Sequence, residues 1–167
     1  MKYLWLGLIL TSSLFAQTYE LKKGEANFEI KVMLKKVDTK STGVKGKINC
    51  NKTCEYLLAI PIMTFTTEDS NRDLNMFTAI EADKFKVATA SGTFPKKIMA
   101  AAEGKIEALI DFHGVKKIYP VTLKNKGSKA SLKLDLDAHG IVRPSLFGFK
   151  MDRILPVEFS LDWQQTN

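Results

Sequence analysis

The stretch Asn27-Phe28-Glu29-Ile30-Lys31-Val32 alternates polar and apolar side chains one residue at a time. Successive side chains of a β-strand point to opposite faces, so this period of two predicts a strand with one face in a core and one in water. The pattern decides the fold class because it recurs along most of the chain. Comparable alternation is found in residues 44–48, 85–89, 106–112, 118–123, 132–136 and 157–163.

One segment departs from this alternation without leaving the strand class. Residues 56–65 form a near-continuous apolar run, which predicts a strand covered on both faces, and Pro61 indicates a bulge or an edge within it. About eight short strands at even spacing, with no regular alternation of strand and helix, predict an all-β antiparallel barrel or sandwich.

A single helix interrupts the strands. Asp69-Ser70-Asn71 supplies side chains that cap helix N-termini, and Leu74, Phe77 and Ile80 follow at helical spacing. We therefore expect one short helix at about 70–82. Residues 93–103 fit either a loop or a helical turn.

The first sixteen residues have the layout of a secretory signal peptide. A basic Lys2 precedes a short apolar run, and small polar residues lead to Ala16. The run is well short of the ~20 apolar residues that a membrane span needs, so an anchor is disfavoured. We expect residues 1–16 to be removed by cleavage near Ala16, which leaves one mature, soluble domain at 17–167.

Composition is that of one globular domain with a basic surface. The chain has 167 residues, of which 45% are hydrophobic and 26% charged, and its formal net charge is +7. Its lysines mostly alternate with apolar residues, as expected of solvated strand faces. We find no basic cluster interleaved with aromatic residues, so nucleic acid is not an expected partner. Transient contact with anionic lipid headgroups is compatible with the charge.

Two cysteines lie four residues apart. Cys50 and Cys54 would form a local disulfide in an oxidising compartment, and closing so short a loop would contribute about 2 kcal/mol. Two free thiols are the alternative. Haem attachment would need His after Cys54, where Glu55 stands, and a zinc site would need two further ligands at suitable spacing.

The sequence contains little that indicates a catalytic site. Asp111 and His113 lie on the same side of a predicted strand, but no nucleophile motif accompanies them. His113 is better explained as a turn residue before Gly114. We expect no enzyme activity, no cofactor and no metal, and keep a lipid hydrolase or isomerase centred on His113 as a rival hypothesis.

The residues expected to face the interior are long or aromatic. Such a barrel can be filled by its own side chains or can hold one elongated ligand, and periodicity does not distinguish the two. The candidates for lining a cavity are Phe28, Ile30, Leu58, Ile60, Ile62, Phe85, Leu134, Phe147, Phe149, Phe159 and Leu161.

Several segments together resemble the YceI-like family of small exported proteins. The segments are 19–21, 28–32 and 44–48, the apolar strand and helix start at 60–67 and 71–76, the His-Gly-Val turn at 112–117, and the Phe-Gly segment at 143–149. The resemblance covers residues 19–163. It departs from the family at Lys84-Phe85-Lys86, where a Pro is usual, and at Lys116, where a Thr is usual.

The resemblance implies a periplasmic, lipocalin-like barrel that holds an amphiphilic chain such as a polyisoprenoid or a fatty acyl compound. It carries over no catalytic residue. Arg72 and Asp73 match a family motif, for which we expect a structural role in fixing the helix start over the barrel.

We therefore predict a single antiparallel lipocalin-like β-barrel of about eight strands with one short helix, acting as a periplasmic lipid-binding or carrier protein. The alternative is a filled barrel that serves as an envelope protein-interaction or stress-response module without a ligand. Exposed barrel edges leave a homodimer open.

Overall fold

The computed structural model describes residues 16–32, 35–143, 145–146 and 149–166. The predicted signal peptide lies almost wholly outside these residues. The strands are β1 (Gln17–Val32), β2 (Lys35–Ser41), β3 (Lys45–Cys50), β4 (Thr53–Pro61), β5 (Phe65–Thr66), β6 (Val87–Pro95), β7 (Glu103–Phe112), β8 (Val115–Lys124), β9 (Lys129–Asp135), β10 (Ser145–Leu146), β11 (Phe149–Lys150) and β12 (Ile154–Gln165).

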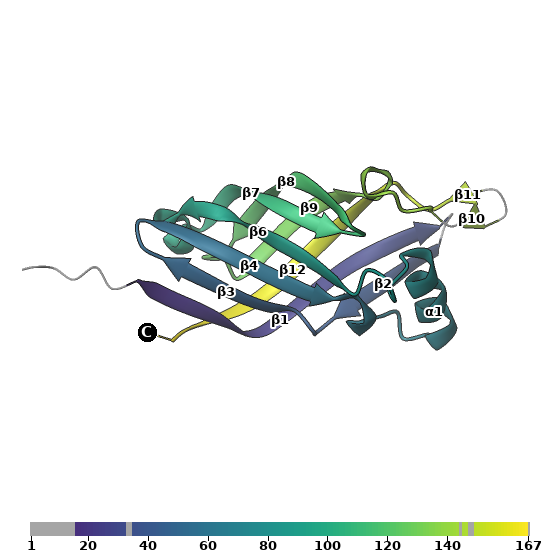
Figure 1. The fold of residues 1–167 in the computed structure, drawn as a ribbon, viewed down its shortest axis with the longest axis horizontal. Helices are drawn as coiled ribbons and strands as arrows, with labels where there is room; N and C mark the ends of the chain where they lie inside the picture. The colour runs from purple at the N-terminus through teal and green to yellow at the C-terminus, as the bar shows by residue number, and fades with distance from the viewer. Residues whose placement is uncertain (1–15, 33–34, 144, 147–148, 167) are drawn as a thin grey trace, which may run out of the picture.

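Eight of these strands close into an antiparallel barrel, as the sequence predicts. The order around the barrel is β1, β12, β9, β8, β7, β6, β4 and β3. β1 closes the ring because β12 pairs along one of its edges while β3 pairs with the start of the other. β2 pairs with the far half of that same edge, and β5 adds to β2. The long β1 and β12 run side by side through the molecule (Figure 1).

The described residues contain one α-helix, α1 (Ser70–Ala79), which begins where the sequence predicts and ends three residues earlier. Asp69 is its N-cap, and its side chain accepts a hydrogen bond from the Arg72 amide at 2.9 Å. Short 3₁₀ helices are η1 (Ile62–Thr64), η2 (Lys96–Ala100) and η3 (Asp137–His139). The ambiguous segment 93–103 is thus the end of β6, the turn η2 and the first residue of β7. No helix of the described residues is long and apolar enough to cross a membrane.

The expectation that residues 56–65 form a strand covered on both faces is wrong. Pro61 ends β4, and the chain turns into η1. Within β4, Tyr56, Leu58 and Ile60 are buried in the barrel, whereas Leu57 lies on the outer face and is 52% exposed. The strand still shows a period of two, because a barrel wall has water on its outer side.

The two ends of the barrel differ, and we name them by what they carry. The helix end holds α1, the two-residue β7–β8 turn and η3. The disulfide end holds the β3–β4 turn, η2, the β8–β9 turn, the start of β1 and the end of β12. In Figure 1 the helix end lies at the right and the chain's C-terminus marks the disulfide end at the left.

Candidate ligand-binding cavity

The barrel has room inside because the inner face of β6 carries small side chains. Ala88, Ala90 and Gly92 stand opposite Ile60, Leu58 and Tyr56 of β4 in the antiparallel register. Residues opposite one another in such a pair point to the same face, so the small side chains face the interior. A wall of methyl groups and hydrogens leaves space that larger side chains would fill.

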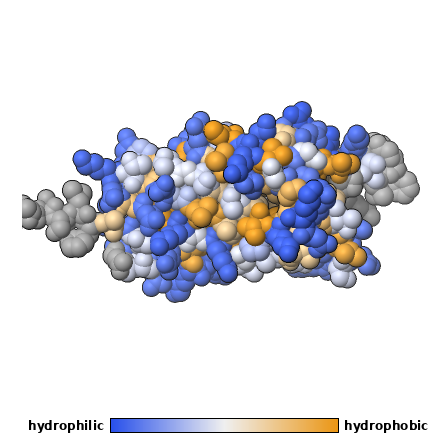
Figure 2. All heavy atoms as spheres, in the orientation of Figure 1, coloured by the Kyte–Doolittle hydropathy of each residue, from blue (hydrophilic) through white to orange (hydrophobic). Residues whose placement is uncertain are grey.

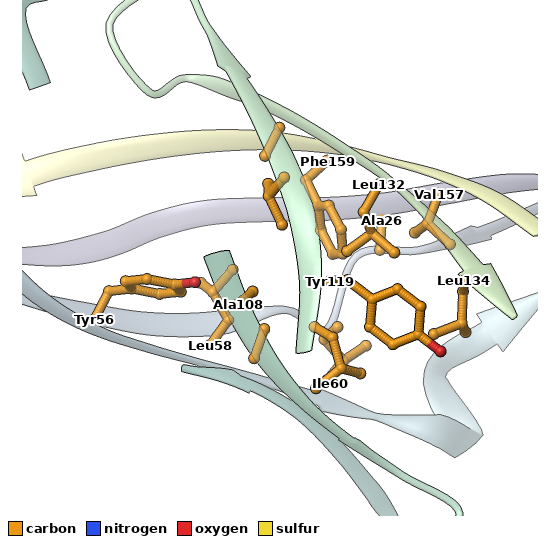
Figure 3. Packing of buried hydrophobic residues seen from close by; sticks show 14 of the residues in the cluster. Ala26, Tyr56, Leu58, Ile60, Ala108, Tyr119, Leu132, Leu134, Val157 and Phe159 are labelled. Atoms are coloured by element: carbon orange, nitrogen blue, oxygen red, sulfur yellow. The ribbon is translucent and has the colours of Figure 1, made fainter. Parts of the chain in front are cut away.

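That space is an apolar cavity of about 300 Å³ at the helix end. In Figure 3, Ile60 of β4, Leu134 of β9 and Val157 and Phe159 of β12 project into this interior. Apart from Thr67, Arg72, Asn75 and Thr89, its walls are apolar: they come from Phe28, Ile30, Val37, Ile60, Ile62, Phe65, Met76, Ala79, Ile80, Ala88, Ala90, Ile110, Phe112, Leu132, Leu134, Leu136, Ile141, Met151, Leu155, Val157 and Phe159.

The helix α1 covers this cavity with one face. Arg72, Asn75, Met76 and Ala79 recur at three- and four-residue spacing and all line the cavity. Asp73, on the same helix, fastens the cover to β5 and the residue after it. Its carboxylate accepts hydrogen bonds from the Thr67 amide at 2.7 Å, the Thr67 hydroxyl at 2.6 Å and the Thr66 hydroxyl at 2.8 Å.

These hydrogen bonds also set the charge of Asp73. Burial acts to raise the pKa of this carboxyl, but the hydrogen bonds from Thr67 and Thr66 outweigh it and hold the pKa below its usual value. Asp73 therefore has a structural role, since it attaches the start of α1 to Thr66 and Thr67, as expected from the family resemblance. Arg72, the neighbouring residue, forms an ion pair with Asp69 at 3.4 Å and also borders the cavity.

Polar groups are concentrated at the edge of the cavity near α1. Phe28, Val37, Thr67 and Arg72 line both the cavity and an open polar groove on the outside. These shared residues mark where the apolar interior meets water. The groove carries charges of both signs, including Lys36 and Lys40 beside Glu29, Asp38, Glu68 and Glu158. Such a border can orient the polar head of a ligand whose apolar part lies inside.

A second, smaller cavity of about 50 Å³ lies toward the disulfide end. Its lining includes Phe94, Met99 and Trp163, so η2 and the end of β12 close it. Three residues line both cavities, namely Ala90, Leu132 and Phe159. Phe159 has the only ring among the three and is 6% exposed. It therefore stands as the bulkiest part of the partition between the two spaces.

The structure places eight of the eleven predicted interior residues at these cavities. Phe28, Ile30, Ile60, Ile62, Leu134 and Phe159 line the larger one, and Leu58, Leu161 and again Phe159 line the smaller one. Phe147 lies outside the described residues, and Phe149 begins β11 with a side chain that is not described.

Phe85 lies elsewhere. Its ring packs on His113 at a centroid distance of 4.3 Å and lines neither cavity. The physical reason is that β6 begins only at Val87, so Phe85 belongs to the turns that leave α1 and not to the barrel wall. Its apparent alternation with Val87 and Thr89 was a misleading signal.

Sequence reasoning missed many of the cavity residues. Ala88 and Ala90 were overlooked because alanine is too small to stand out as a lining residue. Ile110, Leu132 and Val157 belong to segments whose alternation was recognised, and extending that alternation to their inner faces would have found them. Met76 follows Asn75 on a helix whose orientation over the barrel no sequence pattern specifies.

The two cysteines form a disulfide at the tip of the β3–β4 hairpin. Cys50 and Cys54 face each other in the register and are both buried. Farther along β4, the Tyr56 hydroxyl donates a hydrogen bond to the Glu107 carbonyl at 3.2 Å. Burial raises the pKa of Tyr56 to about 12.

His113 occupies the β7–β8 turn with a left-handed φ of 52°. Its Nδ1 lies 3.0 Å from the His139 carbonyl and its Nε2 lies 2.9 Å from Glu81. Both ring nitrogens thus tie elements of the helix end together, and His113 lines neither cavity. The rival hypothesis of a lipid-processing enzyme needs His113 to face the cavity beside a carboxylate and a hydroxyl. Glu81 supplies a carboxylate, but His113 does not face the cavity. Among the described residues there is no cluster of His, Cys, Asp and Glu suited to a metal ion.

Comparison with known proteins supports the fold. A polyisoprenoid-binding domain from Saccharophagus degradans, implicated in plant cell wall breakdown, matches with a TM-score of 0.68 and 15% identity over 88% of this chain and 98% of that one. The chain has the fold of that domain. BcnA of Burkholderia cenocepacia matches with a TM-score of 0.61 and 12% identity over 83% of this chain and 94% of that one.

A mutant YceI protein prepared for nanotechnology applications matches more weakly, with a TM-score of 0.46 and 12% identity over 100% of this chain and 90% of that one. No protein-family model and no curated protein matches the sequence. The barrel fold that the resemblance implied is thus confirmed by the polyisoprenoid-binding domain and by BcnA.

Proposed function

We propose that this protein is an exported, periplasmic carrier or binding protein that holds one amphiphilic lipid, of the polyisoprenoid or fatty acyl type, in its barrel. The observation that carries the proposal is the apolar cavity of about 300 Å³, which meets the polar groups Thr67, Arg72 and Asn75 near α1. A cavity of this size and lining suits an apolar chain with a polar head. The Saccharophagus degradans domain is named as polyisoprenoid-binding, which supports the same class of ligand.

Apolar burial would supply the affinity. Removing some 400 Å² of ligand surface from water at about 25 cal/mol per Å² contributes on the order of 10 kcal/mol before the costs of ordering the ligand. Thr67, Arg72 and Asn75 would act on the head alone. This division of labour explains why the proposal needs no catalytic residue.

The first sixteen residues support the proposed location. Residues 1–16 have the layout of a signal peptide, and β1 begins at Gln17, directly after the expected cleavage site. Removal of the leader would thus leave β1 intact. In the periplasm the Cys50–Cys54 disulfide would be stable as well. The homodimer stays a prediction.

Native mass spectrometry of the protein purified from its own host, followed by organic extraction, tests this function. The proposal expects a bound mass that extraction releases as a prenyl or acyl lipid. Ligand-free protein that also takes up no prenyl or acyl chain in solution would refute it.

A variant separates the carrier from the filled barrel that acts without a ligand. Ala88→Phe places a ring in the larger cavity, and Ser91→Phe adds the same bulk on the outer face, opposite Leu57 and Leu109. If the barrel is hollow, Ala88→Phe abolishes lipid uptake without loss of stability, and Ser91→Phe leaves uptake unchanged. In a filled barrel, Ala88→Phe would cost about 1–3 kcal/mol of unfolding free energy through overpacking.

A further inference from the structure

Three connections that are far apart in sequence lie together at the disulfide end. The β3–β4 turn contacts η2 through a hydrogen bond from the Lys96 amide to the Lys52 carbonyl at 3.2 Å. The β8–β9 turn contacts the segment after η2 through the Asn125 amide and the Ala102 carbonyl at 2.8 Å. The antiparallel topology brings all three to one end of the barrel (Figure 1).

These connections and the strand ends that they join gather positive charge. The exposed lysines there are Lys52, Lys96, Lys97, Lys124, Lys126 and Lys129. None of the six forms a salt bridge with a described residue; Lys129 instead donates a hydrogen bond to the Ser160 hydroxyl at 2.6 Å. The acidic residues at this end are Glu103, opposite Lys124, and Glu20, Glu55 and Asp162 on the neighbouring strand ends. These six lysines outnumber the acidic residues of the same end, which leaves it with a net positive charge.

The helix end is different, because most of its basic groups have acidic partners, although Lys86, Lys117 and Lys150 form no ion pair with a described residue. Ion pairs there join Arg72 to Asp69 at 3.4 Å, Lys84 to Glu81 at 3.9 Å, Lys116 to Asp111 at 3.8 Å and Arg143 to Asp137 at 2.7 Å. The molecule therefore has one end where the lysines named above are unpaired and another where most basic groups form ion pairs. Such a charge distribution orients a molecule in front of a charged surface.

We propose that the disulfide end docks on an anionic lipid bilayer and holds the helix end, with the edge of the cavity, away from the membrane. The contact is electrostatic: each lysine near an anionic membrane surface adds a similar increment of attraction, and the attraction acts over about one Debye length. The docking does not depend on what the cavity holds.

A bilayer fits this surface better than a protein partner does. Specific protein interfaces have an apolar core and are depleted in lysine. The large apolar side chains that are exposed among the described residues lie elsewhere, at Leu57, Met63, Leu74, Val87, Leu109, Ile118, Val142 and Ile154. Lysines without an apolar anchor suit a headgroup layer, which offers many anionic groups and demands no fixed geometry.

The disulfide helps to present this surface. Cys50 and Cys54 close the hairpin whose tip carries Lys52, and the backbone hydrogen bond between Lys52 and Lys96 joins that tip to η2. A fixed arrangement of the three connections keeps their lysines on one side, so all can approach a flat surface together.

Vesicle co-sedimentation of the mature protein tests the docking. The probe is phosphatidylcholine vesicles with and without phosphatidylglycerol. We expect binding to the anionic vesicles at low salt, a loss of binding as salt is raised, and no binding to the neutral vesicles. Replacing Lys52, Lys96, Lys97 and Lys126 by Gln should weaken binding about five-fold for each lysine removed.

A control variant removes the same charge from the other end, with Gln at Lys36, Lys84, Lys86 and Lys116. It should retain most of the binding, because these lysines would face away from the membrane. Equal weakening by both variants would overturn the proposal, since net charge alone would then explain the attraction. Failure to bind anionic vesicles at low salt would overturn it too, and would direct the search to an acidic protein partner. Lipid uptake into the cavity is measured separately, so neither result bears on the proposed carrier function.

Discussion

Tyr56 is a polar group inside an apolar barrel, and its hydroxyl is satisfied by the Glu107 carbonyl, which it reaches over Gly92 of the intervening strand β6. Because burial raises its pKa to about 12, the folded protein keeps Tyr56 neutral at pH values where the unfolded chain, with a pKa near 10, is ionised. The contribution of Tyr56 to the free energy of unfolding is therefore fully present below pH 10 and is lost as the pH rises from about 10 to 12.

The variant Tyr56→Phe makes that dependence measurable. Below pH 10 we expect the variant to unfold about 1 kcal/mol more easily, because the hydrogen bond to Glu107 is lost. As the pH rises above 10 the difference should shrink and then change sign, so that the variant becomes the more stable protein toward pH 12, since Phe has no proton to lose. Urea denaturation across this range checks it, and a difference that does not change with pH would contradict the account.

At the residue scale, the sequence predicted the position of a side chain well where that position depends only on residues nearby in the chain. Cys50 and Cys54 are joined as their spacing suggested, and Asp69 caps the helix that follows it. Ile60 and Leu134 line the cavity because strand alternation alone specifies their face. Phe85 could not be placed, because its position depends on where the chain re-enters the sheet after α1. That point is set by tertiary packing.

At the scale of elements, α1 and its attachment to β5 control access to the cavity. The helix buries none of its residues completely, so it is held over the barrel by a few contacts. The carboxylate of Asp73 supplies three of these contacts through Thr66 and Thr67. An element held in this way can open locally at little cost compared with unfolding of the barrel.

We therefore expect Asp73→Ala to speed the release of a bound lipid. The substitution removes three hydrogen bonds to a charged acceptor, so the unfolding free energy should also fall by about 1–3 kcal/mol. Stopped-flow dissociation of a fluorescent fatty acid measures the release rate. Asp83→Ala, on an exposed turn beyond the helix, is the matched control and should leave the rate unchanged. An unaltered rate in Asp73→Ala would show that the helix does not act as the cover.

Element boundaries were the least predictable feature at this scale. The apolar run at 56–65 reads as one strand, yet it contains the end of β4, η1 and the start of β5. Pro61 supplied the correct hint, because proline cannot donate to a strand ladder. The face exposed by Leu57 was not predictable from a run in which both faces are apolar.

Polar residues cover most of the surface in Figure 2, with apolar side chains gathered in smaller groups between them.

For the whole molecule, the two cavities are arranged along the barrel, with Phe159, Ala90 and Leu132 between them. A ligand chain that fills the larger cavity meets this partition. Each methylene buried before that point should add about 0.8 kcal/mol, which is roughly four-fold in affinity. Beyond it, further methylenes should add little.

A chain-length series tests this partition. Affinities of saturated fatty acids should rise with length and then level off in the unmodified protein. In Phe159→Leu the levelling-off should move to longer chains, because the two cavities join. Phe94→Leu enlarges the smaller cavity alone, as Phe94 lines only that one, and should keep the original limit. The same limit in all three proteins would contradict a role for Phe159.

Whether the barrel is hollow could not be predicted from periodicity. The decisive feature is the pairing of Ala88, Ala90 and Gly92 with the inner face of β4, and that register emerges only from the closed sheet. The collection of lysines at the disulfide end was equally hidden, because in the sequence they are spread over three distant segments. The barrel class was predictable because alternation is a local property, repeated in almost every strand.

The central claim is that a lipid chain lies inside the barrel, and methyl NMR of the delipidated protein tests it most directly. With isoleucine and leucine methyls labelled, addition of a polyisoprenoid alcohol should shift the signals of Ile60, Ile110 and Leu134, which line the larger cavity. The outward-facing Leu57, Leu109 and Ile118 should keep their positions. Shifts confined to those outer residues, or no shift at all, would contradict the account.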